Sequence, residues 1–93
     1  MNATEGIFQI KVQPNDNVNK ITAKLRACME HFSWDKINHA TVHLYRKELS
    51  EQQTQNVMDA CGRLMGRYTM KPHTKKAMLT GYAVVHVEPE AVE

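Results

Sequence analysis

The chain has 93 residues, of which 42% are hydrophobic and 24% are charged. These proportions are typical of globular domains, so they exclude a disordered or collagen-like chain and predict one domain, residues 1–93, with one core. No apolar run approaches the ~18–20 residues of a membrane span, and residues 1–5 do not resemble a signal peptide. Twelve Lys and Arg against ten Asp and Glu leave a formal charge of +2, which selects no partner class. We expect a cytoplasmic protein, and its two cysteines make no disulfide scaffold.

The first predicted strand covers residues 6–13. Phe8, Ile10 and Val12 alternate with polar residues, which is typical of a half-buried strand, and Pro14 ends it. From Asp16 to about Phe32 the apolar residues instead recur at steps of three and four, which predicts an amphipathic helix.

A connection and a second strand follow that helix. In residues 33–38, Trp34 and Ile37 are expected to fold over the core as a lid. Residues 39–46 alternate again, with Ala40, Val42 and Leu44 on one face, so they predict a strand.

The second helix is predicted to begin at a capping box. The Ser50 hydroxyl would accept from the backbone N–H of Gln53, and the Gln53 side chain would reach back to the cap. Apolar residues at helical spacing then continue to Tyr68, with Gly62 and Gly66 inside the pattern. Either these glycines let another element approach closely, or Gly66 ends the helix.

The last third of the chain begins with a polar, basic segment, residues 69–76, which is predicted to be a loop broken by Pro72. Residues 78–87 are apolar and predict a central strand covered on most of both faces, with a bulge or hairpin tip at Gly81. Residues 88–93 are expected to be a frayed acidic tail.

The element order is therefore β-α-β-α-β, and the expected fold class is an α/β sandwich. Each helix has one apolar stripe, so a three-stranded sheet with two helices packed on one face buries both stripes most simply. The expected core is Phe8, Ile10, Val12, Ile21, Leu25, Cys28, Phe32, Val42, Leu44, Val57, Cys61, Leu64, Leu79, Val85 and Val87.

The residues that could carry enzymatic chemistry are few and scattered. His39 and His43 lie four residues apart on a predicted strand, about 13 Å from each other, which is too far for two ligands of one metal ion. Cys28 and Cys61 fall on apolar helix stripes, so we interpret them as packing residues. No phosphate-binding glycine loop occurs. We therefore expect no catalytic residues, no metal, no cofactor and no enzyme activity.

One stretch of the chain concentrates positive charge. Residues 60–87 contain no acidic residue and carry five basic ones, with a histidine among them: Arg63, Arg67, Lys71, His73, Lys75 and Lys76. If the second helix continued, Arg63 and Arg67 would share a face directed toward the basic loop. Such a segment is typical of sequence-tolerant nucleic-acid binding. The alternative is a solvated helix end whose arginines favour the C-terminal dipole.

The polar side of the second strand is another candidate binding surface. His39, Thr41, His43 and Tyr45 would form a row open to solvent or to a partner if helices covered only the other side of the sheet. We therefore place His43 and Tyr45 with the basic residues as candidate contacts for nucleic acid or a protein.

Residues 42–53 followed by residues 58–64 resemble the NinB-type phage recombination proteins. The shared features are a strand, a Ser-led helix start rich in Gln and Asn, and an Ala60-Cys61 pair in that helix, within residues 6–68. The resemblance implies a phage protein, in the host cytoplasm, that binds single-stranded DNA.

Two non-enzymatic functions are thus open. The first is a small accessory protein that binds single-stranded DNA or RNA through the basic segment. The second is a stoichiometric inhibitor of a host nucleic-acid-processing protein, of the anti-CRISPR or anti-nuclease type. No membrane partner is expected, and a homodimer is an open alternative.

Overall fold

The computed structural model describes residues 5–45 and 48–89. In chain order, the elements are β1 (Glu5–Ile10), α1 (Val18–His31), β2 (His39–Leu44), α2 (Glu51–Leu64), β3 (Tyr68–Pro72), α3 (Lys75–Leu79) and β4 (Val84–Pro89). The four strands form one mixed sheet in the order β1-β2-β4-β3. β1 and β2 are parallel, whereas β4 is antiparallel to both of its neighbours, β2 and β3.

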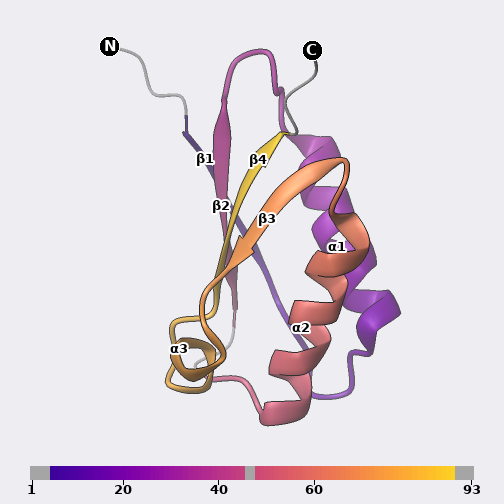
Figure 1. Ribbon diagram of the computed structural model, residues 1–93, viewed down its shortest axis with the longest axis vertical. Coiled ribbons are helices and arrows are strands. Elements are labelled where there is room, and N and C mark those ends of the chain that lie inside the picture. Colours follow the sequence, from indigo (N-terminus) through magenta and orange to yellow (C-terminus); the bar gives the residue numbers. More distant parts are fainter. Residues whose placement is uncertain (1–4, 46–47, 90–93) are drawn as a thin grey trace.

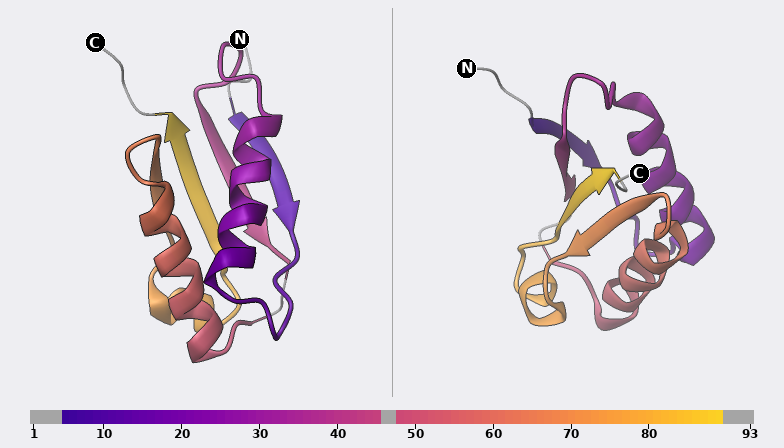
Figure 2. Two further views of the ribbon diagram at one scale, coloured as in Figure 1. Left: turned by 90° about the vertical axis from the view of Figure 1, so that its right-hand side faces the viewer. Right: turned by 45° about the horizontal axis from the view of Figure 1, so that its top comes forward.

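The helices α1 and α2 lie side by side on one face of this sheet (Figures 1 and 2). Their apolar stripes are buried against it: Leu25 of α1 is 0% exposed and Leu64 of α2 is 2% exposed. The helix faces predicted from the sequence are therefore confirmed. Most of the expected core is buried as well, although Phe8, Phe32 and Leu79 are only partly buried.

Side-chain oxygens cap the two long helices at their N-termini. Ser50 accepts a hydrogen bond from the backbone N–H of Gln53, as the sequence predicted. At α1 the cap is Asn17, which accepts from the backbone N–H of Lys20. The second half of the predicted capping box is wrong. The Gln53 side chain instead donates to the backbone carbonyls of Gln13 and Pro14, which lie in the connection between β1 and α1.

The prediction of a three-stranded sheet is wrong, because residues 68–72 form β3 and not a loop. Met70 is buried while Lys71 is exposed, so this short edge strand has the alternation of a half-buried strand. Pro72 stands at its last position, where an edge strand tolerates a missing N–H.

The predicted strand over residues 78–87 is also corrected. Met78 and Leu79 belong to α3, and Gly81, with φ of 109°, lies in the turn before β4. β4 is a central strand as expected, but it is covered on one face only, because His86 is exposed. Glu88 lies in β4, so it is not part of a frayed tail; residues 90–93 and Arg46 lie outside the described residues.

Gly62 lies within α2 and Gly66 follows its end, and the two glycines have different structural roles. Gly66 has φ of 101° and follows the end of the helix, which is the second of the alternatives left open by the sequence. A Cβ at Gly62 would meet no atom within 4 Å, so this glycine does not allow another element to approach closely.

The predicted lid after α1 is confirmed. The indole N–H of Trp34 donates to the carbonyl of Met29 at 2.9 Å, and the ring packs against the core. Ile37 and Phe32 come so close to Gly6 that a Cβ there would lie 2.7 and 2.6 Å from their side-chain atoms.

Candidate nucleic-acid interface

The face of the sheet opposite α1 and α2 is the candidate interface, and we call it the open sheet face. Neither α1 nor α2 lies on this face, and α3 lies at one end of the sheet (Figure 1). The strand register aligns its side chains in rows across the sheet, one of which consists of Ile7, Thr41, His86 and Lys71. The predicted row on β2 is thus part of a wider surface that includes all four strands, although Thr41 within this row is buried and not open to solvent as expected.

Two exposed tyrosines lie opposite each other at one end of this face. The backbone N–H of Leu44 donates to the carbonyl of Ala83 at 2.9 Å, which extends the β2–β4 ladder beyond its last strand pair. The next residues on the two chains are Tyr45 and Tyr82. They are 60% and 69% exposed, whereas Leu44 and Ala83 are buried, so the tyrosines project on the open side.

The histidine of the predicted basic segment lies on the same face. The backbone N–H of His73 donates to the carbonyl of Val84 at 2.9 Å, which places His73 beside β4. Its ring centroid is 5.4 Å from that of His86. In the register, His43 lies on the other side of Val84. Three histidines from β2, β4 and the end of β3 therefore border this part of the sheet.

Lys71 is the basic residue of the edge strand β3. Its ammonium group is 3.9 Å from the carboxylate of Glu88 on β4, and both side chains are more than half exposed. An exposed pair at this distance contributes little to stability, so Lys71 keeps its capacity to contact an anionic ligand.

Lys75 and Lys76 lie in α3, beyond the end of β3 (Figure 1). The N–H of Tyr82 donates to the carbonyl of Ala77 at 2.9 Å, so α3 is attached to the tyrosine end of the open sheet face. Lys75 is 4.0 Å from the exposed carboxylate of Glu51, which is again a weak pair.

The two arginines of the predicted basic segment lie elsewhere. The guanidinium of Arg63 donates to the side chain of Asn19, so it bridges α2 and α1 in the helix layer. α2 ends at Leu64, and Arg67 follows Gly66 in the turn before β3. The helical face that Arg63 and Arg67 would share is therefore not formed. The structure divides the basic residues between the helix layer, the open sheet face and α3.

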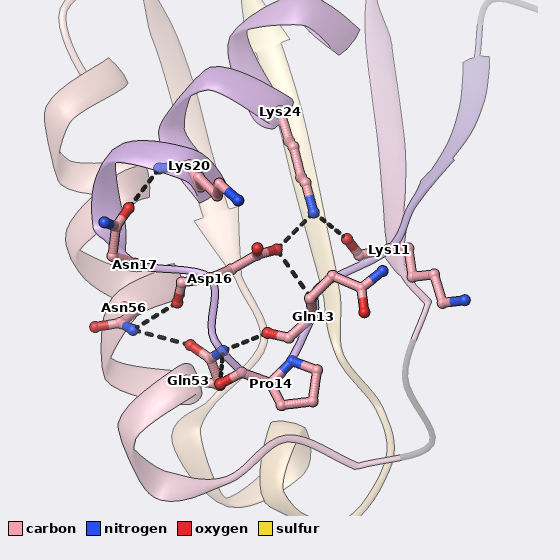
Figure 3. Close-up of polar contacts among 9 residues, drawn as sticks. All are labelled: Lys11, Gln13, Pro14, Asp16, Asn17, Lys20, Lys24, Gln53 and Asn56. Atoms are coloured by element: carbon pink, nitrogen blue, oxygen red, sulfur yellow. Dashed lines mark hydrogen bonds and ion pairs between the residues drawn. The ribbon is translucent and has the colours of Figure 1, made fainter.

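A buried polar cluster joins the β1–α1 connection to the helices (Figure 3). The Asp16 side chain is 2% exposed, and its carboxylate accepts from the ammonium of Lys24 at 2.5 Å and from the N–H of Gln13 at 2.9 Å. Burial of Asp16 acts to raise its pKa. The hydrogen bonds from Lys24 and Gln13, together with the positive charge of Lys24, outweigh burial and lower the pKa below its ordinary value.

The same connection is fixed from α2. The Asn56 side chain donates to the carbonyl of Asp16 at 3.2 Å and to the Gln53 side chain at 2.8 Å. The sequence predicted only a capping role for Gln53 and no role for Asn56. Both Gln53 and Asn56 belong to α2. Here they satisfy buried backbone carbonyls, which is a structural role.

The cysteines are not arranged for nucleophilic chemistry. Both are buried, and burial raises the pKa of Cys28 to about 11 and the pKa of Cys61 to about 12. His31, three residues after Cys28, is exposed and packs edge-on against Phe8 at a centroid distance of 5.4 Å. In the described part of the chain there is no pocket and no group of three or more His, Cys, Asp or Glu residues that would enclose a metal ion.

Comparisons of the chain with protein-family models, with curated proteins and with solved structures found no match. No helix within residues 5–45 and 48–89 has the length and apolar character needed to cross a bilayer.

Proposed function

We propose that the protein binds single-stranded nucleic acid on the open sheet face and has no enzyme activity of its own. The observation that carries this proposal is the position of Tyr45 opposite Tyr82, both more than half exposed at the end of the central β2–β4 ladder. Unpaired bases stack on such rings with about 1–3 kcal/mol per base. A four-stranded sheet with exposed aromatic residues is one of the common surfaces for single-stranded RNA.

The charges around this aromatic pair suit a phosphate backbone. Lys71 lies on the open sheet face, and Lys75 and Lys76 lie in α3, which is attached to the tyrosine end. Phosphate contacts from these residues would be independent of sequence. In a duplex the bases are stacked inside and cannot reach the tyrosine rings, so this surface favours single strands. The resemblance of residues 42–53 and 58–64 to NinB-type proteins supports the same ligand class.

The test is a titration of fluorescently labelled single-stranded and duplex oligonucleotides at several salt concentrations. We expect tighter binding of the single strand, with log K falling linearly with log salt by about 0.7 per phosphate contact. Replacing both tyrosines, by Tyr45→Ala and Tyr82→Ala, is expected to weaken binding by about tenfold or more. The matched control is Met65→Ala, since Met65 is 57% exposed and lies beyond the end of α2. Absence of binding at every salt concentration would contradict the proposal.

A specific observation also favours the inhibitor function. Ile7 is 64% exposed on β1, and in the described residues this edge strand pairs with β2 alone. An exposed edge with an apolar side chain is suited to addition of a strand from a partner protein. Stoichiometric inhibition of a host nuclease without any affinity for oligonucleotides would select this function over the first.

A further inference from the structure

His73 and His86 form a close pair of imidazole rings on the open sheet face. Their centroids are 5.4 Å apart and the ring planes meet at 49°. His86 belongs to β4, and His73 follows β3 with its N–H bonded to the carbonyl of Val84. The backbone ladder between β3 and β4 therefore fixes the separation of the two rings.

The first ring is oriented by a hydrogen bond to the main chain. Nδ1 of His73 lies 2.7 Å from the carbonyl oxygen of Tyr82. A carbonyl only accepts, so Nδ1 carries the proton, and the neutral ring has its lone pair on Nε2. Nε2 lies on the far side of the ring from Nδ1. Nε2 is therefore directed away from Tyr82, and the His86 ring is the neighbouring ring further along β4.

The second ring is oriented from the opposite side of β4. Nδ1 of His86 lies 3.3 Å from the hydroxyl oxygen of Thr41, which is on β2. When this hydroxyl accepts, Nδ1 of His86 carries the proton and Nε2 has the lone pair. The sheet order places β3, and with it His73, on the side of β4 opposite Thr41. Each Nδ1 is thus held by its own partner, and Nε2 is the nitrogen that each ring has left for a further ligand.

We propose that His73 and His86 bind a divalent late transition-metal ion, with Zn²⁺ as its representative, through these two Nε2 atoms. Zinc binds imidazole nitrogen at ~2.0–2.1 Å. With a tetrahedral N–Zn–N angle, two imidazole rings on one zinc ion have their centroids about 5 Å apart. The observed 5.4 Å fits that arrangement. A hydrogen bond from the other ring nitrogen to a carbonyl or hydroxyl oxygen is the usual means of orienting a metal-binding histidine.

Water completes the coordination, since the protein supplies two ligands and the face is open to solvent. Two charged groups border the site. Lys71, opposite His86 in the register, repels a cation, and Glu88, two residues after His86, attracts it. Removing the positive charge is therefore expected to strengthen metal binding. Because the metal ion is titrated alone, the outcome does not depend on whether the open sheet face binds nucleic acid.

The experiment is a titration of the full chain with Zn²⁺ in the absence of nucleic acid. Binding is measured by calorimetry and by NMR of the imidazole nitrogens. We expect one ion per chain and a change in the Nε2 signals of both rings. His73→Asn and His86→Asn should each weaken binding at least tenfold, and Lys71→Gln should strengthen it severalfold. The matched control is His39→Asn, because the His39 ring on β2 is hydrogen-bonded to the side chain of Asn38 and is not part of the pair. The zinc affinity of this variant should stay within twofold of that of the parent.

Single substitutions of His73 and His86 that leave zinc affinity within twofold of the parent would exclude the pair as ligands. Unchanged Nε2 signals for either ring in the parent protein would do the same, and this measurement does not depend on whether a variant folds.

Discussion

The carboxylate of Asp16 accepts a hydrogen bond from the ammonium group of Lys24 at 2.5 Å, and this pair joins the connection after β1 to α1. The same ammonium group donates to the carbonyl of Lys11. A single lysine therefore holds both ends of the connection. Since Gln53 and Asn56 attach this connection to α2 as well, we expect it to contribute to the stability of the whole domain.

Replacing the carboxylate should therefore destabilise the protein at neutral pH. A hydrogen bond to a charged group contributes about 1.5–3 kcal/mol, so Asp16→Ala is expected to lower the free energy of unfolding by roughly that amount. Because the pKa of Asp16 is lowered by folding, the stabilisation is fully present above the unfolded-state pKa of about 3.9. It is lost as the pH falls through the lower folded-state value. Urea unfolding at neutral and acid pH measures both effects.

The control for this prediction is Asp35→Ala, because Asp35 is exposed. Its unfolding free energy should change by less than about 0.5 kcal/mol. An Asp16→Ala variant as stable as the control at neutral pH would show that the buried pair does not stabilise the fold.

Gly62 and Gly66 should respond to alanine in opposite directions. Gly62 is exposed within α2 and has open space around it, so Gly62→Ala is expected to stabilise the protein by about 0.5–1 kcal/mol. Gly66 has φ of 101°, a conformation that strains residues with a Cβ, so Gly66→Ala should destabilise it by about 1–2 kcal/mol. Thermal unfolding of the two variants checks this; equal shifts would contradict the helix end at Leu64.

The periodic elements were predictable from the sequence because their apolar residues repeat locally. Apolar residues at steps of three and four predicted α1, and the alternation of Ala40, Val42 and Leu44 with polar residues predicted β2. β3 was missed because its five residues contain Lys71 and Pro72, which favour a loop, although Met70 alternates into the core. The capping signal of α3 is present, since Thr74 accepts from the N–H of Ala77, but the apolar residues after it matched a strand equally well.

The candidate site was less accessible to such reasoning. Tyr45 was recognised as part of a strand face, but Tyr82 is 37 residues away in the sequence. Only the continuation of the β2–β4 ladder through Leu44 and Ala83 brings the two together. Arg63 and Arg67 were predicted to share one helix face because the apolar spacing continued to Tyr68. The helix in fact ends before Gly66. Pairing between strands is tertiary information that local periodicity does not contain.

The two thiols should be unreactive in the folded protein. With pKa values of about 11 and about 12, Cys28 and Cys61 have at least about a hundredfold less thiolate near pH 8 than an exposed cysteine, and both are buried. We expect slow reaction with a thiol reagent in buffer and rapid reaction of both groups in denaturant. Fast stoichiometric labelling of the native protein would mean that α1 and α2 readily separate from the sheet and expose the two thiols.

Charge changes on the open sheet face should alter oligonucleotide binding with little effect on folding. Lys71→Gln is expected to weaken binding and reduce the salt slope by about 0.7, and Glu88→Gln to strengthen binding a few-fold, since it removes a competing carboxylate. Arg63→Gln is the matched control, because Arg63 lies in the helix layer. A loss of binding in Arg63→Gln alone would place the interface on the helices.

The most direct measurement is a backbone-amide NMR titration of the labelled protein with a short single-stranded oligonucleotide. Binding on the open sheet face predicts signal changes concentrated at Tyr45 and Tyr82 and along β3 and β4, with the outer residues of α1 and α2 unchanged. Changes confined to the helix layer around Arg63, or a spectrum that the oligonucleotide does not change at all, would contradict the proposed interface.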